Sequence, residues 1–233
     1  MFKRWKEGAA LAIEDSLREL MASVPEALWG IADISYSEYA ADYGAAIMLA
    51  VPYGEQLTIE DYAEERFESG IVAARTIIDD LIPRITALLT EAGAHCWVPP
   101  VAQRDEVELL APFSFKTAAV RAGLGWFGRN DVLITERYGP RVRLSAILTD
   151  AQMPCGQPVT ESHCPPNCRL CVDACPCKAL TGATWTPSTE RSELIDYHRC
   201  NRYRSAFIPK LGRKNACGLC LAACPYGITK NKA

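Results

Sequence analysis

Hydrophobic positions in the first 150 residues recur with the periods of helices and strands. Residues 3–22 follow a helical period. Four hydrophobic residues fall near one face of that predicted helix: Leu11, Leu17, Leu20 and Met21. A continuous apolar run at 45–51, ended by Pro52, predicts a strand that is buried on both faces.

The longest helical pattern covers residues 59–92. Thr58 precedes it as a predicted N-cap, and acidic residues follow in the first turn, where they favour the positive end of the helix dipole. Pro83 interrupts the pattern, so the sequence predicts a kink or a division of the helix there. Gly93 is the predicted stop, because glycine readily adopts the left-handed conformation that ends helices.

Shorter elements follow this long helix. A strand is predicted at 94–98, where two prolines end it, and a helix is predicted at 115–122. Two strands are predicted at 131–135 and 142–149, joined by a turn at 138–140. The alternation of strands and helices predicts an α/β or α+β first domain.

The pattern changes after Asp150. Regular periodicity is lost, and prolines arrive together with cysteines. A shift of composition of this kind is typical of a domain boundary. The sequence therefore predicts a first domain over 1–150 and a smaller second domain over 151–233.

The composition is that of a soluble globular protein, with 49% hydrophobic and 23% charged residues among 233. No stretch reaches the roughly 18 consecutive apolar residues that a membrane span needs. The basic start at 1–6 is followed by an amphipathic pattern rather than an apolar signal core. We therefore expect a cytoplasmic protein without a membrane partner. The net charge of −3 argues against a protein that binds nucleic acid through its global field.

Eleven cysteines are the outlying feature of the composition, and ten of them lie between Cys155 and Cys224. Clustered cysteines in a reducing compartment favour metal binding over disulfides. The segment Cys-Arg-Leu-Cys-Val-Asp-Ala-Cys-Pro at 168–176 is repeated as Cys-Gly-Leu-Cys-Leu-Ala-Ala-Cys-Pro at 217–225. Six of the nine positions are identical, so the two cysteine runs are an internal repeat.

The cysteine spacing predicts two [4Fe–4S] clusters. In ferredoxin-type runs the closely spaced thiolates bind one cluster, and the last cysteine, which precedes a proline, serves the other cluster. This exchange closes the count at eight ligands. The first predicted set is Cys164, Cys168, Cys171 and Cys224. The second predicted set is Cys175, Cys200, Cys217 and Cys220.

Structural zinc is the main alternative, although zinc sites usually pair two separated Cys-x2-Cys knuckles. One cluster plus zinc is a further alternative. The first gap holds three residues, including prolines at 165–166, where ferredoxins have two. Three cysteines stay unassigned: Cys96, Cys155 and Cys177. Cys177 follows Cys175 closely and either competes as a ligand or is a small buried residue beside the cluster.

A glycine-rich segment, Ala-Gly-Leu-Gly-Trp-Phe-Gly-Arg-Asn at 122–130, carries the other candidate chemistry. Its glycines permit a tight loop and a close approach of backbone to a ligand. The segment follows a predicted helix rather than a strand, so it is not a dinucleotide-binding fingerprint. A second motif, Tyr-Gly-Pro-Arg-Val-Arg, stands at 138–143. Its Arg141 and Arg143 share one face of a predicted strand and either clamp a ligand or face water.

Together with the double cysteine run, these two segments resemble epoxyqueuosine reductases and reductive dehalogenases over about residues 110–230. The resemblance implies a nitroreductase-like three-layer α/β domain that binds cobalamin. It also implies a bacterial ferredoxin-like module, whose two clusters feed electrons to the cobalt. The corrinoid contacts that it implies are Gly123, Gly125, Trp126, Gly128, Arg129 and Asn130. Arg141 joins this set as the candidate clamp for the cofactor.

The sequence departs from this family in two places. Epoxyqueuosine reductases have an acidic proton donor before the glycine-rich segment, and the matching position here is Leu109, which cannot donate a proton. No catalytic residue is therefore assigned. Those enzymes also continue past the clusters into helical repeats that help to hold tRNA, whereas nine residues follow Cys224 here. A tRNA partner is therefore not expected.

Two functions of different classes follow from these motifs. The first is an iron–sulfur reductase of the epoxyqueuosine reductase type. In it, a low-potential donor of the ferredoxin or flavodoxin type supplies electrons, which pass through two [4Fe–4S] clusters to a corrinoid that reduces a small organic substrate. The second is a non-catalytic electron-transfer or activator protein, which reduces the corrinoid of a partner protein. A flavin in place of cobalamin is a third interpretation.

Overall fold

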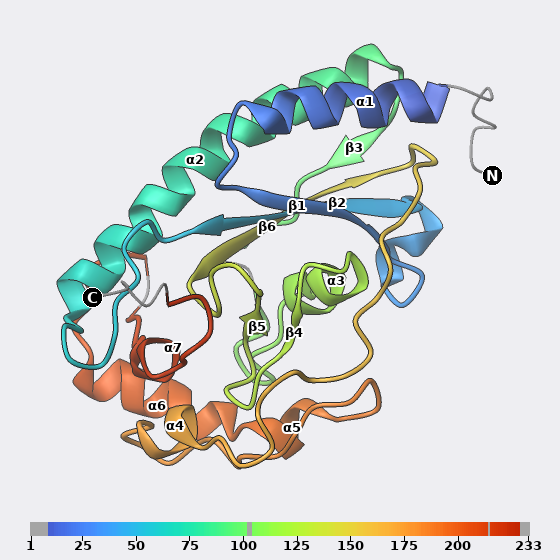
Figure 1. Ribbon diagram of the computed structural model, residues 1–233. Coiled ribbons are helices and arrows are strands. Elements are labelled where there is room, and N and C mark those ends of the chain that lie inside the picture. Colours follow the sequence, from blue (N-terminus) through green and yellow to red (C-terminus); the bar gives the residue numbers. More distant parts are fainter. Residues whose placement is uncertain (1–8, 102–103, 214, 229–233) are drawn as a thin grey trace. The chain divides into compact units, whose positions relative to one another are not determined.

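The computed structural model describes residues 9–101, 104–213 and 215–228 (Figure 1). The basic start noted at 1–6 lies outside these ranges. The chain divides into two compact units of three segments each. Unit 1 holds the described residues of Met1–Val51, Arg75–Leu124 and Arg143–Pro158. Unit 2 holds those of Pro52–Ala74, Gly125–Val142 and Val159–Ala233. The division into domains 1–150 and 151–233 stays a prediction.

Unit 1 is built on a four-stranded sheet in the order β1–β2–β6–β3. The strands are β1 (Leu28–Asp33), β2 (Ala45–Pro52), β6 (Val142–Thr149) and β3 (Cys96–Trp97). β1 pairs antiparallel with β2, and β3 pairs antiparallel with β6. The strands predicted at 45–51 and 142–149 are confirmed, and the one predicted at 94–98 is shorter. The sequence analysis did not predict β1, because Gly30 interrupts its short apolar run.

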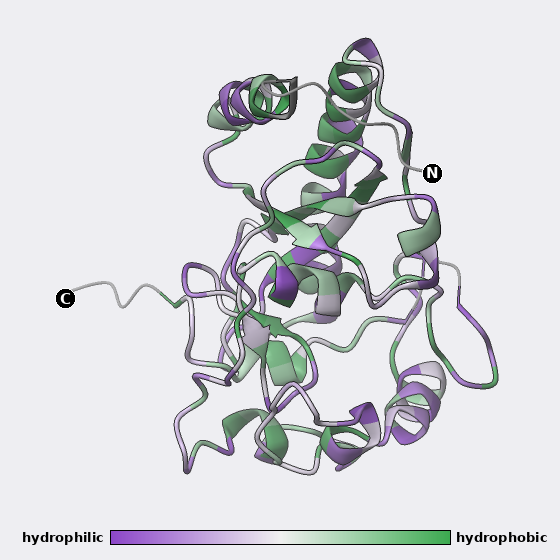
Figure 2. Cartoon of the chain, turned by 90° about the vertical axis from the view of Figure 1, so that its right-hand side faces the viewer, coloured by the Kyte–Doolittle hydropathy of each residue, from purple (hydrophilic) through white to green (hydrophobic). Residues whose placement is uncertain are grey.

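Helices cover both faces of this sheet (Figure 1). α1 (Ala9–Ala22) and residues 75–91 of α2 (Glu64–Glu91) lie on one face, and α3 (Phe115–Arg121) packs against β1 on the other. A 3-10 helix, η1 (Glu38–Ala41), precedes β2. In Figure 2 both α1 and α2 carry hydrophobic and hydrophilic residues, as expected of helices with one buried face.

The predicted buried face of α1 is confirmed in part. Leu17 and Met21 are buried as predicted, together with Ile13, and these three residues, spaced four apart, are each at most 3% exposed. Leu11 was predicted on the same face and is 59% exposed. It stands two positions before Ile13, which places it about 200° around the helix axis from that residue.

α2 begins later than predicted and does not divide. The N–H and the hydroxyl of Thr58 both donate to the Asp61 carboxylate, at 2.6 and 2.9 Å, in a turn that precedes the helix. Pro83 lies inside the helix, because the buried apolar face continues on both sides of it. Gly93 follows the last turn with a φ of 79°, which confirms the predicted stop. No helix in the described ranges is long and apolar enough to cross a bilayer.

Unit 2 contains short elements joined by long loops. Besides residues 64–74 of α2, its strands and helices within the described ranges are β4 (Trp126–Phe127), β5 (Leu133–Ile134), α4 (Leu170–Asp173), α5 (Arg191–Leu194), α6 (Tyr197–Phe207) and α7 (Leu219–Ala222). β5 pairs antiparallel with β4. The predicted strands at 131–135 and 142–149 therefore follow one another in the chain but belong to different sheets. The mixed α/β class is confirmed, whereas the nitroreductase-like layering and the ferredoxin-like module stay predictions.

The β4–β5 pair depends on a close approach of backbone at Gly125. A Cβ atom at this position would lie 2.0 Å from the carbonyl oxygen of Ile134. Such a distance is far inside van der Waals contact, so the strand would have to shift.

We therefore expect Gly125→Ala to lower the free energy of unfolding by about 1–3 kcal/mol, the usual cost of forcing extra atoms into a packed site. Urea unfolding monitored by circular dichroism measures it. Gly44→Ala is the control, because nothing lies within 4 Å of a Cβ added there. Equal losses in the two variants would contradict the steric explanation.

Candidate iron–sulfur site

The repeated cysteine segment folds twice into the same short turn. Arg169 and Gly218 precede α4 and α7 with ψ angles of 9° and 4°. Ala174 and Ala223 end these helices with φ angles of −71° and −73°. The backbone hydrogen bonds of the two copies also match, and α4 packs against α7. The internal repeat of the sequence is therefore a repeat of local structure, with its two copies side by side.

One group of four thiols lines a single cavity. Its members are the first predicted set, Cys164, Cys168, Cys171 and Cys224. Cys171 and Cys224 are buried, and the other two are half-buried. Cys224 belongs to the second copy of the repeat, yet it lies with three thiols of the first run. The fold thus makes the exchange of the last cysteine that the spacing predicts.

The second predicted set gathers in a hydrophobic cluster. Buried Cys175 belongs to this cluster, and the half-buried Cys200 and Cys220 pack against it. Cys177 packs there too, and its Sγ atom is 3.7 Å from that of Cys175. Cys217, the fourth member of the predicted set, is half-buried and lies three positions before Cys220, next to the start of α7. Cys171 of the first set also belongs to the cluster, so the cluster contains thiols of both predicted sets and the unassigned Cys177.

Burial and neighbouring thiols raise the pKa of cysteines in both groups. Burial, followed by the charges of the other three members of its group, raises the pKa of Cys171 to about 12. Burial raises the pKa of Cys224 to about 11, and the charges of Cys164 and Cys168 add to the effect. The pKa of Cys220 lies well above its ordinary value, again chiefly because of burial. As thiolates these groups repel one another, so they need bound cations.

The donor set fits iron–sulfur clusters. Thiolates are the ligands of [4Fe–4S] clusters, and eight thiols stand here in two groups of four. Within the described part of the chain, no three His, Cys, Asp or Glu side chains form a ready site for a single metal ion. The assignment of the eight cysteines as ligands stays a prediction.

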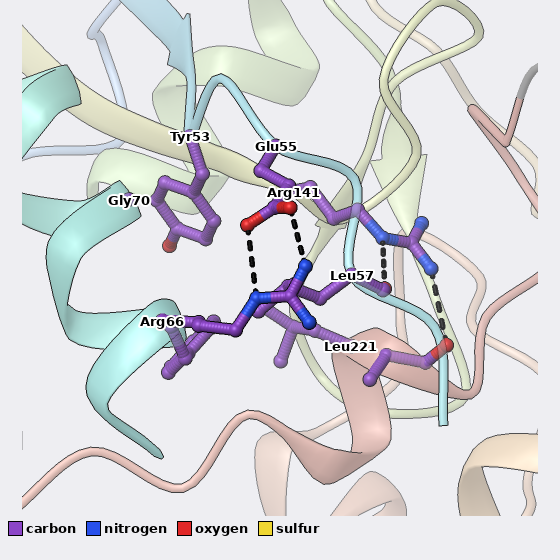
Figure 3. A pocket seen from close by; sticks show the side chains of 9 residues that line it. Tyr53, Glu55, Leu57, Arg66, Gly70, Arg141 and Leu221 are labelled. Carbon is purple, nitrogen blue, oxygen red and sulfur yellow. Dashed lines mark hydrogen bonds and ion pairs between the residues drawn. The ribbon is translucent and has the colours of Figure 1, made fainter. Parts of the chain in front are cut away.

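Arg141, which directly precedes β6 in the chain, anchors the second cysteine run. The residue is 3% exposed. Its Nε donates to the carbonyl of Leu57 at 3.0 Å (Figure 3). Its Nη1 donates to the carbonyl of Tyr226 at 2.8 Å. Its Nη2 donates to the carbonyls of Ala222 and Cys224, at 3.1 and 2.8 Å. All three nitrogens thus serve backbone carbonyls of unit 2, which favours a structural role.

Arg129 and Asn130 also face the cysteine runs. Both line the cavity of the first thiol group, and neither is more than 8% exposed. The Nη2 of Arg129 donates to the Pro166 carbonyl at 2.9 Å, and its Nη1 donates to the Gly182 carbonyl. The Nδ2 of Asn130 donates to the Cys220 carbonyl at 3.1 Å. The end of the glycine-rich segment therefore supports both cysteine runs.

The rest of the glycine-rich segment is also packed by the protein itself. Trp126 is 1% exposed, and its ring centroid lies 4.5 Å from that of His163 and 5.0 Å from that of Tyr226. Gly128 is buried, and Gly123 is exposed with a φ of 77°. Apart from Gly123, the residues predicted to contact a corrinoid are buried among contacts within unit 2. They do not form an open surface for a corrinoid, and the corrinoid contacts stay a prediction.

Position 109 offers no acid. Leu109 is 6% exposed and adopts a φ of 55°. The carboxylate of nearby Asp105 accepts hydrogen bonds from the N–H groups of Val107 and Glu108, at 2.8 and 2.6 Å, and so shapes the local turn. Nothing in this segment of the structure assigns a proton donor.

Two tyrosines support the site, although no sequence motif predicted that they would. The hydroxyl of Tyr62 accepts a hydrogen bond from the N–H of Gly218 at 2.8 Å, between two cysteines of the second run. The hydroxyl of Tyr226 donates to the carbonyl of His163 at 2.6 Å, next to the first run. The position of Tyr226 directly after Cys224-Pro225 is a weak indication in the sequence that it lies at the site. The sequence gives no such indication for Tyr62, which lies 156 positions from its partner Gly218.

No protein-family model matches the chain. The sequence is 33% identical over 123 residues to an epoxyqueuosine reductase of Synechococcus sp. (strain RCC307), which covers 50% of this chain and 35% of that protein. It is 31% identical over 189 residues to a tetrachloroethene reductive dehalogenase of Dehalobacter restrictus (strain DSM 9455 / PER-K23), covering 72% of this chain and 31% of that one. The resemblance to these reductases is confirmed. The chain spans about a third of the length of both relatives.

Solved structures of both kinds of reductase share the fold. A crystal structure of selenomethionine-labelled epoxyqueuosine reductase superposes with a TM-score of 0.64 at 15% identity, over 94% of this chain and 66% of that one. A reductive dehalogenase, whose structure suggests a mechanism for B12-dependent dehalogenation, superposes with a TM-score of 0.56 at 20% identity. It covers 87% of this chain and 30% of that one. At these identities the likeness concerns the fold alone.

We expect Arg141→Met to lower the free energy of unfolding by roughly 1–3 kcal/mol, because buried carbonyls lose their donor. Urea unfolding is the measurement. Arg143→Met is the matched control, since Arg143 stands two positions further on and is only half-buried. If the two variants unfold at the same urea concentration, Arg141 does not anchor the second run.

Proposed function

We propose that the chain is an iron–sulfur oxidoreductase module that holds two [4Fe–4S] clusters and serves a reductase reaction of the kind its homologues carry out. The observation that carries this proposal is the mixing of the two cysteine runs. Cys224 of the second run lines a cavity with three thiols of the first run, and Cys175 of the first run shares a hydrophobic cluster with Cys200 and Cys220. Such an exchange serves two neighbouring clusters and has no use at a single metal site.

The first group, Cys164, Cys168, Cys171 and Cys224, would hold one cluster, and the second, Cys175, Cys200, Cys217 and Cys220, would hold the other. When bound, the clusters supply single-electron transfer. Three of these thiols, Cys171, Cys175 and Cys224, are buried and thus shielded from water. Such burial is one of the means by which proteins set cluster potentials.

A corrinoid is the electron acceptor that we propose, because a reductive dehalogenase of the same fold acts in B12-dependent dehalogenation. We further propose a low-potential electron donor of the ferredoxin or flavodoxin type and a small organic substrate. A flavin in place of the corrinoid stays an alternative. Apart from Gly123, the residues predicted to contact a corrinoid are buried, so the corrinoid is the part of the proposal that most needs a direct test.

A second function is favoured by Leu109 and by the buried arginines. An enzyme that protonates its substrate needs an acid, and position 109 holds a buried hydrocarbon side chain. Arg129 and Arg141, both predicted to hold a cofactor, are engaged by carbonyls beside the cysteines. These contacts suit a protein that passes electrons to the corrinoid of a partner and catalyses nothing itself.

Anaerobic purification with iron, sulfide and cobalt analysis, followed by a cobalamin titration watched by absorbance and EPR, separates these functions. About eight irons per chain together with cobalamin binding supports the reductase. About eight irons without cobalamin binding supports the electron-transfer protein or a flavin. A chain that retains no iron and sulfide after anaerobic reconstitution would falsify both.

Removing one ligand of the second group tests the assignment of the clusters. We expect Cys175→Ala to lower the iron content from about eight to about four per chain, because one cluster loses a thiolate. Cys177→Ala is the control and should keep about eight irons.

The neighbouring thiol gives the same experiment a second reading. If Cys177 replaces Cys175 as a ligand across their 3.7 Å separation, Cys175→Ala keeps its iron and only the double variant loses it. Full iron content in the double variant would remove Cys175 from the ligand set. EPR of the reduced proteins shows which cluster is affected.

A further inference from the structure

Arg129 leaves one donor unexplained at the cavity of the first thiol group. The side chain is 8% exposed and lines the cavity together with the four predicted ligands. Both Nη atoms are used, by the carbonyls of Pro166 and Gly182. The Nε atom is buried and has no hydrogen-bond partner among the described residues. Burying an N–H group without an acceptor costs free energy, so we expect its acceptor to belong to a group bound in the cavity.

The loop between the first two cysteines of the cavity is poor in backbone donors. Pro165 and Pro166 have no N–H group. The N–H of Cys164 donates to the hydroxyl of Ser162 at 3.4 Å, and that of Cys168 donates to the carbonyl of Pro165 at 3.0 Å. Cluster sulfur atoms ordinarily receive hydrogen bonds from the protein, and these bonds help to set the reduction potential. At this loop most of the backbone donors are missing or used elsewhere.

The other polar side chains of the cavity do not fill that gap. The Nδ2 of Asn130 already donates one hydrogen to the carbonyl of Cys220, and its Oδ1 is an acceptor, as the sulfur atoms are. The hydroxyl of Tyr226 donates to the carbonyl of His163. Among the described residues that line the cavity, Arg129 is therefore the side chain whose buried donor nitrogen has no partner at all.

We propose that Arg129 donates its Nε–H to a sulfur atom of the cluster bound by Cys164, Cys168, Cys171 and Cys224, and thereby raises the reduction potential of that cluster. Reduction adds negative charge to the cluster, and a cationic donor stabilises the more negative state. The inference rests on the proposed function, since it requires the cluster. It assigns Arg129 to the cluster, whereas the sequence resemblance assigned it to a corrinoid.

Redox titration of the loaded protein, followed by EPR, measures the effect on each cluster. We expect Arg129→Gln to lower the potential of one cluster and leave the other unchanged. A tenfold loss in the ratio of reduced to oxidised cluster corresponds to about 59 mV for one electron, and this is the size of shift we expect. Arg129→Lys keeps the charge without the planar donor and should shift the potential less.

Arg169→Gln is the matched control. It removes the same charge from the same cysteine run, but the side chain of Arg169 is 58% exposed. Water screens exposed charges, so this variant should leave both potentials nearly unchanged. Equal shifts in Arg129→Gln and Arg169→Gln would mean that charge alone acts, and would overturn the proposal.

The unaltered protein offers an independent test if the variants lose iron. Pulsed EPR of the reduced protein, grown with ¹⁵N-arginine, should show a nitrogen coupled to one cluster. Absence of any such coupling, in protein that contains about eight irons, overturns the role of Arg129 and leaves the clusters standing. Protein without iron would instead overturn the proposed function itself.

Discussion

Unit 2 depends on the gathering of eight buried and half-buried thiols that would repel one another as thiolates. Two copies of one short turn place these thiols, and the last cysteine of each copy joins the group formed by the other run. Neither group can be completed without both copies, so α4 and α7 have to pack together. Burial, and after it the charges of neighbouring thiols, raises the pKa of Cys171 and of Cys220. Bound iron would stabilise the thiolate forms.

Two arginines stabilise this arrangement from the segments that precede it. Arg141 donates to carbonyls of the second run, and Arg129 donates to a carbonyl of the first. Both occur in motifs that, in the sequence, resemble the cofactor-binding segments of reductases. In the structure the arginines of these motifs also support the cysteine loops. Loops of this kind have few regular backbone partners, so their carbonyls need side-chain donors. Motifs that accompany cysteine runs in a sequence can therefore reflect support for the loops as well as contact with a further cofactor.

The likeness to epoxyqueuosine reductases and reductive dehalogenases concerns the fold and the order of motifs, and the chain differs at the position of the acid. The side chain of Leu109 is a hydrocarbon and therefore cannot donate a proton. The residue is also buried, in a left-handed backbone conformation. A reductive reaction here would take its proton from another group, from the substrate or from a partner protein. The same observation is compatible with a protein that only transfers electrons, which is why the two proposed functions share one site.

The sequence by itself determined the features that arise from local order. The cysteine spacing predicted both thiol groups, and continuous or periodic apolar runs predicted β2, β6 and the body of α2, because these patterns act over a few neighbouring residues. Only the tertiary structure decided that Leu11 of α1 is exposed, that β5 pairs with β4, and that Arg141 and Tyr62 hold the second cysteine run. Arg141 reaches the carbonyl of Leu57 across 84 positions, and Tyr62 meets Gly218 across 156. Contacts between residues so far apart produce no periodic pattern in the sequence. Many polar side chains could make them, and only the packing of the folded chain selects which ones do.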